Sequence, residues 1–374
     1  MSGYALLARA WGAEVAGWDR VETPYLEHLD DVAVEISPEP PQPPAGWEAY
    51  VSTAFVGRVD ARPRADLLAE LVAQRRAIVV AGAHGKTTTT AMIAFCLERL
   101  GLDPSFLIGG DVPQLGGNAR AGSGWLVVEG DESDRSVASL RPEIAVLLNV
   151  DLDHHTTFVS RSELEAFFED WLREVPHVVR AEELAPVELD LAVPGEHNRR
   201  NAAAALAALE LAGVPGREAE AAIVEFRGAG RRLEPRGEAG GVVVLDSYAH
   251  HPAELAADLA AVRDRGRLLA LFQPHLYSRT AHLAHGFAEA LAAADAACVT
   301  EIYAAREDPV AGVSGRLVAD ELARVRPGMR IAWAPALDDA ARIVAGWARP
   351  GDTVLTLGAG DVDRAAPLLL EALA

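Results

Sequence analysis

Residues 77–90 read Ala-Ile-Val-Val-Ala-Gly-Ala-His-Gly-Lys-Thr-Thr-Thr-Thr. The apolar, β-branched run at the start is typical of a buried strand, and it ends abruptly at Gly82. Two glycines and a lysine follow, and a helical pattern then extends from Thr87 to Leu100 and stops at Gly101. Strand, glycine loop and helix in this order are the context of a phosphate-binding loop.

The residue types in this loop suit a nucleoside triphosphate. Glycines let backbone N–H groups close around phosphate oxygens, and the helix N-terminus adds partial positive charge. Lys86 is placed to reach the terminal phosphates, and the Thr87 hydroxyl to hold Mg²⁺. The spacing is shorter than the common G-x-x-x-x-G-K-[ST], because Val80 stands where the first glycine would be. A plain glycine turn is the alternative, and the lysine and threonine that follow in order favour the nucleotide site.

Composition limits the class of protein. The 374 residues predict two or three domains, and 50% hydrophobic residues are enough for sizeable cores. A formal net charge of −21 argues against wide contact with nucleic acid or anionic membranes. Cys96 and Cys298 each lie in an apolar segment, which indicates buried thiols in a reducing compartment. Without a long apolar run or a leader pattern at the N-terminus, we expect a soluble, cytoplasmic protein with no membrane insertion.

The first 76 residues predict half of a dinucleotide-binding unit. A helix is expected over 4–12 and a strand over 14–18 with Asp19 at its tip, which is the second half of a βαβ unit. The first strand and its glycine turn would precede Met1, so either the start lies upstream or the domain has lost that strand. A proline-rich loop over 38–44 and a short helix over 67–74 follow, which places a domain boundary near residue 76.

From residue 77 onward, strands and helices alternate. Strands are predicted over 125–129 and 144–150. A helix is predicted to open with a capping box from Ser162 to Glu165, and an alanine-rich helix is predicted over 198–211. A hinge over 226–232 leads to a further unit, with strands over 241–246, 267–272, 296–301, 330–334 and 352–357. Continuous apolar strands separated by helices predict an α/β fold with parallel sheets covered on both faces.

Two acidic clusters follow predicted strands. One is Glu129-Gly-Asp-Glu-Ser-Asp134, and the other is Asn149-Val-Asp-Leu-Asp-His-His155. Because open α/β sheets bind ligands at the carboxyl ends of their strands, these groups could complete a Mg²⁺ shell beside Thr87. The alternative for any single acid is a solvated loop residue.

Three further polar segments are candidates for ligand binding. Residues 195–201 (Gly-Glu-His-Asn-Arg-Arg-Asn) begin a helix with side chains that could contact a base edge, although a simple N-cap is the alternative. Residues 246–252 and 272–280, which are dense in histidine, tyrosine and arginine, both follow apolar strands. The alternative hypothesis, that the loops 246–252 and 272–280 have only a structural role, is less favoured.

Taken in chain order, these motifs resemble the Mur ligase family. The matching patterns are Gly-x-His-Gly-Lys-Thr-Thr, Glu-x-Asp-Glu-Ser-Asp, Asn-x-x-x-Asp-His, Gly-x-His-Asn-x-x-Asn, Asp-x-Tyr-x-His-His-Pro and Phe-Gln-Pro-His-x-Tyr-x-Arg-Thr. The resemblance covers essentially 1–374 and implies a three-domain α/β architecture. It implies an N-terminal Rossmann-like UDP-sugar domain over 1–76 that lacks its first strand, a central P-loop ATP-binding domain over 77–228, and a Rossmann-like ligase domain over 229–374.

The resemblance also implies residue roles. Lys86, His154 and Arg279 would be catalytic, and Thr87, Glu129 and His154 would hold Mg²⁺. The amino acid would meet Tyr248, His250, His275 and Arg279. The ATP phosphates would be bound by the pair Arg231 and Arg232 and by the phosphate loop, whose residues are Gly82, Ala83, His84, Gly85, Lys86, Thr87 and Thr88. His197 and Asn198 would contact the adenine, and Asp246 would lie near the ribose.

The implied reaction is ATP-dependent amide formation through an acyl phosphate. The resemblance is strongest to the branch that joins UDP-N-acetylmuramate to L-alanine, with ATP and Mg²⁺, in a monomer or homodimer. A recycling ligase that attaches a tripeptide and an ATP-binding homologue without ligase activity are the alternatives. The sequence departs from the family pattern at Leu276, where many relatives have arginine, at Thr156, where an acid is usual, and in shorter segments after Thr53 and between Trp171 and Pro194.

Overall fold

The computed structural model describes residues 1–152, 157–305 and 307–374. The chain forms two compact units, and each is described here by itself. The first unit contains Met1–Ala192 and Asn198–Gly228, and the second contains Val193–His197 and Ala229–Ala374. The predicted division into three domains at residues 76 and 228 stays a prediction.

The N-terminal part of the first unit is built from short elements. Helix α1 (Ser2–Ala10) precedes β1 (Ala16–Asp19), which pairs in parallel with β2 (Ala33–Ile36). Strands β3 (Tyr50–Val51) and β4 (Arg62–Pro63) form a second parallel pair, and α2 (Arg64–Ala73) follows. The predicted helix and strand before residue 20 are therefore confirmed to within two residues, and residues 38–44 form no helix or strand.

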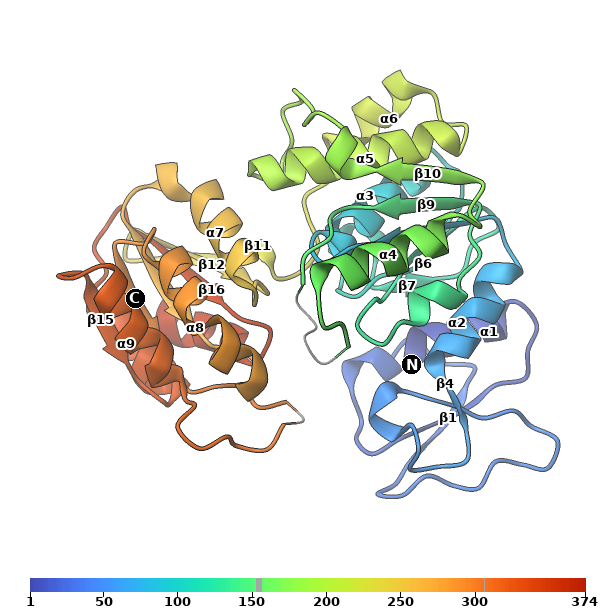
Figure 1. The fold of residues 1–374 in the computed structure, drawn as a ribbon, viewed down its shortest axis with the longest axis horizontal. Coiled ribbons are helices and arrows are strands. Elements are labelled where there is room, and N and C mark those ends of the chain that lie inside the picture. The colour runs from blue at the N-terminus through green and yellow to red at the C-terminus, as the bar shows by residue number, and fades with distance from the viewer. Residues whose placement is uncertain (153–156, 306) are drawn as a thin grey trace. The chain divides into compact units, whose positions relative to one another are not determined.

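A six-stranded sheet forms the centre of the first unit (Figure 1). Its order is β10-β9-β5-β8-β6-β7, and all neighbours are parallel except β6 and β7. The strands are β5 (Ala77–Ala81), β6 (Ser105–Leu107), β7 (Ala119–Arg120), β8 (Leu126–Glu129), β9 (Ile144–Leu147) and β10 (His177–Arg180). The fully buried β5 lies between β8 and β9, so both acidic clusters flank the loop that leaves β5.

Helices cover both faces of this sheet. Ala77, Val79 and Ala81 face a core shared with α1, α2 and α4, and the alternate residues Ile78 and Val80 are buried on the other side. The helices after β5 are α3 (Lys86–Arg99), α4 (Arg161–Leu172), α5 (Glu196–Leu211) and α6 (Gly216–Ile223). Helix α5 extends across the boundary between the units, because its first two residues group with the second unit.

One predicted helix start was wrong by two residues. The cap of α4 is Ser160, whose side chain accepts a hydrogen bond from the Glu163 backbone N–H. The Glu163 carboxylate accepts in turn from the Val159 backbone N–H at 2.9 Å. The N-cap of α4 is therefore Ser160 and not Ser162. Both serines precede an acid by three residues, so the pattern alone does not separate them.

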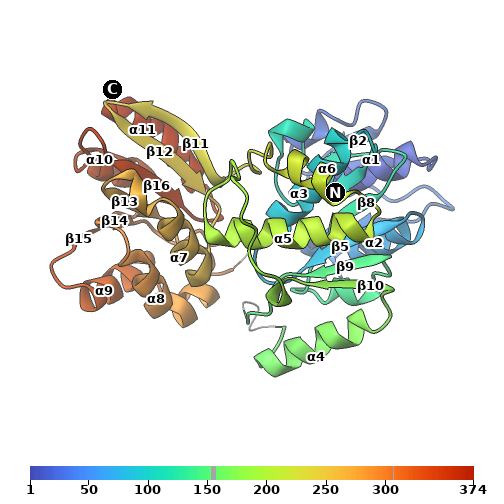
Figure 2. The same cartoon turned by 90° about the horizontal axis from the view of Figure 1, so that it is seen from above.

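The second unit contains another six-stranded sheet, ordered β11-β12-β16-β13-β14-β15 (Figure 2). Only β11, which pairs with β12, is antiparallel. The strands are β11 (Arg232–Ala239), β12 (Val242–Ser247), β13 (Leu268–Phe272), β14 (Ala296–Val299), β15 (Arg330–Trp333) and β16 (Thr353–Leu357). All five predicted strands are present, so the α/β fold with largely parallel sheets is confirmed.

Helices again pack on both faces of this sheet. Helices α7 (Pro252–Ala261), α8 (Tyr277–Leu291) and α9 (Gly315–Val325) share one core, and α10 (Leu337–Ala345) and α11 (Ala365–Leu373) share the other. Short 3₁₀ helices complete the two units: η1 (Pro24–Leu26), η2 (Thr53–Phe55), η3 (Pro113–Leu115), η4 (Ser136–Ser139), η5 (Ala181–Glu183), η6 (Arg263–Arg265) and η7 (Val362–Arg364). In the described parts of the chain, no helix has the length and apolar character needed to cross a bilayer.

Candidate active site

The phosphate loop requires its two glycines. Gly82 has φ of 128° and Gly85 has φ of 87°, a region that other L-residues rarely adopt. A Cβ atom at Gly82 would come within 2.9 Å of the Asn149 carbonyl oxygen, and one at Gly85 within 2.5 Å of the Asn201 Oδ1. Helix α3 then begins at Lys86 with no side-chain cap on its N-terminus. The loop therefore delivers a helix N-terminus to the carboxyl edge of the sheet, the geometry that binds phosphate.

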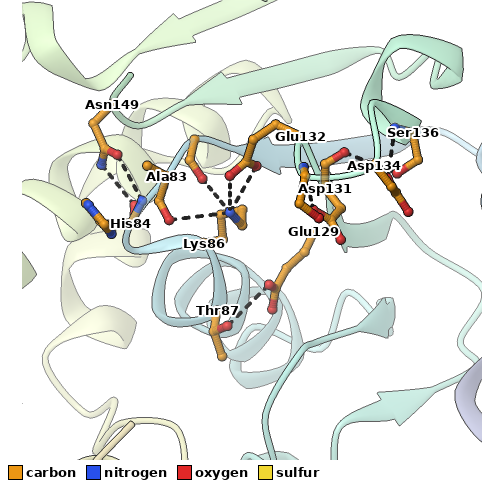
Figure 3. A network of polar contacts seen from close by, with 12 residues as sticks. Ala83, His84, Lys86, Thr87, Glu129, Asp131, Glu132, Asp134, Ser136 and Asn149 are labelled. Carbon is orange, nitrogen blue, oxygen red and sulfur yellow. Dashed lines mark hydrogen bonds and ion pairs between the residues drawn. The ribbon is translucent and has the colours of Figure 1, made fainter. Parts of the chain in front are cut away.

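Asn149 holds the loop in shape. Its side chain accepts a hydrogen bond from the His84 backbone N–H and donates one to the His84 carbonyl, both at 2.9 Å (Figure 3). The Ala83 backbone N–H donates to the Asn149 carbonyl at 3.4 Å. The acidic segment after β9 therefore supports the phosphate loop through its first residue.

Lys86 is held at the centre of the loop (Figure 3). Its ammonium donates to the Gly82 carbonyl at 2.6 Å and to both carboxylate oxygens of Glu132 at 3.0 Å. Burial alone would lower the pKa of Lys86, but the attraction of Glu132, with Asp131 and Glu129 behind it, outweighs burial and raises the pKa. The lysine is therefore a fixed positive charge across the physiological pH range.

Thr87 and Glu129 meet where the resemblance expects a metal. The Thr87 hydroxyl donates to Glu129 Oε2 at 3.2 Å, and Glu129 Oε1 accepts from the Gly109 backbone N–H at 2.5 Å. Neighbouring oxygens in an octahedral Mg²⁺ shell lie about 3 Å apart, so these two oxygens fit adjacent ligand positions. His154 lies outside the described residues, and among those described no group of three or more metal-binding side chains gathers. The metal roles of these residues stay predictions.

The acidic cluster that follows β8 is balanced by the arginine at the start of α2. Arg64, the first residue of α2, donates to Asp131 at 2.9 Å and lies 3.8 Å from Asp134. The pKa of Asp131 is lowered although burial opposes this, because Ser133, Lys86 and Arg64 stabilise its charge. Asp131 therefore stays ionised beside the loop, and its charge helps to keep Lys86 protonated.

In the second unit, Arg231 and Asp246 form a clamp. The guanidinium of Arg231 donates to Asp246 Oδ2 at 2.8 Å, to the Gly360 carbonyl at 2.8 Å and to the Gly358 carbonyl at 2.7 Å. Asp246 is fully buried and also accepts from the Thr356 hydroxyl at 2.5 Å. These contacts give Arg231 and Asp246 a structural role in joining β11, β12 and the end of β16. The predicted contacts of both residues with ATP stay predictions.

The predicted amino-acid residues lie together at the carboxyl edge of the second sheet. The rings of Tyr248 and His250 are 5.4 Å apart, those of His250 and His275 6.0 Å, and His275 stacks on Tyr303 at 5.8 Å. The Arg279 guanidinium lies 3.2 Å from His275 Nδ1, and Leu276 takes a strained φ of 69° at the start of α8. One cluster of rings and a guanidinium therefore follows β12 and β13.

A cavity of about 610 Å³ opens at the same edge, beside this cluster. Gln273, Glu301, Tyr303 and Asp361 are among the residues that line it. Tyr303 also stacks on His275, so the cavity borders the ring cluster. Its volume is larger than a single alanine side chain requires.

Comparison with known proteins identifies the family. Residues 80–170 match the Mur ligase middle domain, and residues 231–360 match the Mur ligase glutamate ligase domain. The chain is 37% identical to the UDP-N-acetylmuramate–L-alanine ligase of Streptomyces griseus and 38% identical to that of Streptomyces coelicolor, in each case over 100% of this chain and 95% of the relative. The chain belongs to the Mur ligase family.

A solved Mur ligase has the same fold along the whole chain. The UDP-N-acetylmuramate–alanine ligase of Thermotoga maritima superposes with a TM-score of 0.78 at 25% identity, over 99% of this chain and 96% of that one. The match to the Streptomyces griseus protein extends over 452 residues, so this Mur ligase lacks segments that its relatives carry. The predicted α/β Mur ligase fold is confirmed.

Two residues organise the site in a way that the sequence pattern does not show. Glu132 is the direct partner of Lys86, and Asn149 binds the backbone of the loop, whereas the pattern predicts only that both belong to acidic segments. Both residues lie in the short segments that follow β8 and β9, the two strands beside β5, and this position is the sequence feature that could have indicated their roles. The boundary between the two units falls between His197 and Asn198, the predicted adenine residues, and their role at the base stays a prediction.

Asp258 on α7 is a further titratable group near His197. Burial raises its pKa to about 7, although a hydrogen bond from Ser247 and the charge of Arg232 oppose this. A carboxyl group with a raised pKa holds a proton in the folded chain that the unfolded chain has released, so stability falls as the pH rises from about 4 to about 7.

We therefore expect Asp258→Asn to change the free energy of unfolding of the second unit more favourably at pH 8 than at pH 5. The difference between the two pH values should be on the order of 2–4 kcal/mol. Melting temperatures of both proteins at pH 5 and pH 8 measure it. An equal shift at both pH values would contradict a raised pKa for Asp258.

Proposed function

We propose that this Mur ligase joins the lactyl carboxylate of UDP-N-acetylmuramate to L-alanine, with ATP, in peptidoglycan precursor synthesis. The observation that carries the proposal is the fixed Lys86 charge in a phosphate loop, in a chain that is similar over its whole length to two alanine-adding ligases. We infer that it works in the cytoplasm as a monomer or homodimer, without nucleic acid.

The reaction has two steps. A carboxylate oxygen of the sugar nucleotide attacks the γ-phosphorus of ATP, ADP departs, and an acyl phosphate forms. The amine of L-alanine then attacks the acyl carbon, loses a proton, and expels inorganic phosphate to leave an amide.

Residues of this chain contribute mainly charge and position. The ammonium of Lys86 and the uncapped N-terminus of α3 lie where negative charge builds up during phosphoryl transfer. Thr87 and Glu129 would hold Mg²⁺, which when bound neutralises phosphate charge. The two hydrogen bonds between the Asn149 side chain and the His84 backbone hold the loop in one conformation, so little reorganisation is needed when the nucleotide binds.

The ring cluster of the second unit suits an amino acid. Arg279 is 8% exposed, and a buried guanidinium attracts a carboxylate strongly. Because Leu276 stands where many relatives have arginine, recognition of the carboxylate depends more heavily on Arg279 in this chain.

Arg279→Ala should therefore raise the KM for L-alanine by roughly a hundredfold and change the KM for ATP far less, since a charge-assisted contact contributes about 2–3 kcal/mol. Steady-state kinetics with each substrate varied in turn measure both values. Arg316→Ala, which removes an exposed arginine paired with Asp320 on α9, is the control. Equal increases for both substrates would remove Arg279 from the amino-acid site.

Phosphate release tests the proposal and its alternatives. The chain is mixed with ATP, Mg²⁺ and UDP-N-acetylmuramate, and L-alanine, glycine, L-serine or the L-alanyl-γ-D-glutamyl-meso-diaminopimelate tripeptide is added in turn. Release that requires both the sugar nucleotide and L-alanine supports the proposal. The tripeptide belongs in the test because of the cavity of about 610 Å³, and a preference for it would favour a recycling ligase. ATP binding without release under any condition would favour a homologue that has lost ligase activity.

A further inference from the structure

Helix α8 begins without a cap of its own. Its N-cap residue is Leu276, which has no side-chain acceptor and takes φ of 69°, a conformation that residues other than glycine rarely adopt. The N–H groups of a first helical turn have no partner within the helix, and a positive φ at a leucine costs further free energy. The first turn of α8 therefore needs support from elsewhere in the chain.

Glu307, which lies 29 positions after Ser278, gives this support. Its Oε2 accepts a hydrogen bond from the Ser278 backbone N–H at 2.8 Å, and its Oε1 accepts one from the Ser278 hydroxyl. Ser278 is the second residue of α8, so the carboxylate lies at the end of the helix where the partial positive charge stabilises it. Glu307 therefore does for α8 what the side chain of an N-cap residue does in other helices.

The chain after β14 is also joined to the start of α8 through its backbone. The Leu276 N–H donates to the Tyr303 carbonyl at 3.0 Å, and the Tyr303 N–H donates to the Pro274 carbonyl at 2.8 Å. His275 and Tyr303 form a parallel β-bridge, and their rings stack with an interplanar angle of 13°. Tyr303 and Glu307 therefore fix the start of α8 at two successive points.

Arg279 is carried by this first turn. It is the third residue of α8, it is 8% exposed, and it directly follows Ser278, the residue that Glu307 holds. On its other side, the fully buried Thr280 donates to the Leu276 carbonyl, from its backbone N–H at 3.1 Å and from its hydroxyl at 2.8 Å. The backbone of Arg279 is therefore fixed between these two anchors, and Glu307 is the one that comes from outside the helix.

We propose that Glu307 is a positioning residue that holds Arg279 in place for the carboxylate of the incoming amino acid. This inference rests on the proposed function and on Arg279 as the contact of that carboxylate. Without the cap, the first turn of α8 loses order and Leu276 can leave its positive φ, so only a fraction of the molecules presents Arg279 correctly at any moment. The alternative is that the Glu307 carboxylate attracts the ammonium group of the amino acid directly. Positioning is favoured because both carboxylate oxygens already accept from Ser278.

Glu307→Ala should raise the KM for L-alanine by roughly tenfold and leave kcat and the KM for ATP within about twofold of the wild-type values. The apparent affinity falls by the fraction of molecules that hold Arg279 in place, and saturating L-alanine restores that conformation. Steady-state ligation with each substrate varied in turn measures the three values. A general loss of structure would lower kcat as well, so the separation of KM from kcat identifies positioning.

Hydrogen exchange of the full chain, without any substrate, measures the order of the first turn directly. Mass spectrometry of the peptide that spans residues 276–284 should show exchange at least about tenfold faster in Glu307→Ala than in the wild type, because the capped turn opens more often. Exchange in the strands of the same sheet should stay unchanged.

Three further variants separate positioning from the charge of Glu307. In Glu307→Gln the amide oxygen can accept from the Ser278 N–H and the NH₂ group can donate to the Ser278 hydroxyl, so kinetics and exchange should stay close to those of the wild type. Asp308→Ala removes the exposed carboxylate of the next residue and should change neither. In a chain that already carries Arg279→Ala, Glu307→Ala should raise the KM for L-alanine no further, because Glu307 acts through Arg279.

Unchanged exchange or an unchanged KM for L-alanine in Glu307→Ala overturns the inference, and so does an additive loss in the double variant. A Glu307→Gln variant as impaired as Glu307→Ala overturns it too, and would assign Glu307 to the ammonium group instead. Failure of the proposed function is seen separately, as the absence of phosphate release by the wild-type chain. The exchange measurement needs no ligation, so it decides in that case as well whether Glu307 holds the turn that carries Arg279.

Discussion

Lys86→Ala combined with Glu132→Gln should lower the rate of ligation by at least about a thousandfold while the chain stays folded. A cation aimed at the transferred phosphoryl group contributes roughly this much in comparable reactions. Lys86 is the only lysine of the chain, so no neighbouring lysine can take its place. The measurement is the rate of amide formation at saturating substrates, with circular dichroism and melting temperature as the test of folding.

The second substitution is needed because Lys86 and Glu132 are buried together. Their side chains are 18% and 2% exposed, and removal of Lys86 takes away the cation that both oxygens of the buried Glu132 carboxylate face, which costs about 3–5 kcal/mol. Lys86→Ala alone would therefore lose activity partly through instability. Glu132→Gln alone keeps the lysine and is the control, and it should retain much more activity than the double variant. Near-normal turnover in the double variant would contradict the phosphate-loop assignment.

Thr87→Val should raise the Mg²⁺ concentration needed for half-maximal activity by roughly tenfold or more and lower the maximal rate by roughly a hundredfold. The substitution keeps the size of a side chain that is 8% exposed, and it removes the hydroxyl that faces Glu129. The remaining carboxylate would then hold the metal with one protein ligand fewer. Activity measured over a range of free Mg²⁺ gives both values.

Thr87→Ser retains the hydroxyl and is the matched control. We expect its Mg²⁺ dependence to stay close to that of the wild type, because loss of the methyl group changes packing but no ligand. If Thr87→Val and Thr87→Ser require the same Mg²⁺ concentration, the hydroxyl is not a metal ligand.

The elements around the phosphate loop could be predicted because several local signals agree there. The apolar run of β5, the two glycines and the start of α3 all point to one geometry, and the structure has it within one residue. The five parallel strands of the second sheet were predicted for the same reason, because buried parallel strands are nearly continuous apolar runs. The antiparallel β11, which is largely exposed and polar, was not predicted.

Pairings between distant residues could not be predicted in the same way. The bond from Lys86 to Glu132 spans 46 positions, and the clamp of Arg231 on Gly358 and Gly360 spans more than 120. Such contacts depend on strand order, which a single sequence does not specify. The cap of α4 shows the local limit, since Ser160 and Ser162 satisfy the same pattern and only the observed bond to the Glu163 N–H separates them.

The proposed ligase reaction is tested most directly by following one oxygen atom. UDP-N-acetylmuramate labelled with ¹⁸O in both oxygens of its lactyl carboxylate is incubated with the chain, ATP, Mg²⁺ and L-alanine, and the products are analysed by mass spectrometry. The acyl-phosphate route gives UDP-N-acetylmuramoyl-L-alanine and inorganic phosphate that carries one ¹⁸O atom, because the carboxylate oxygen leaves with the phosphoryl group. Amide formed with unlabelled phosphate would contradict the acyl-phosphate route, and the absence of amide would contradict the ligase itself.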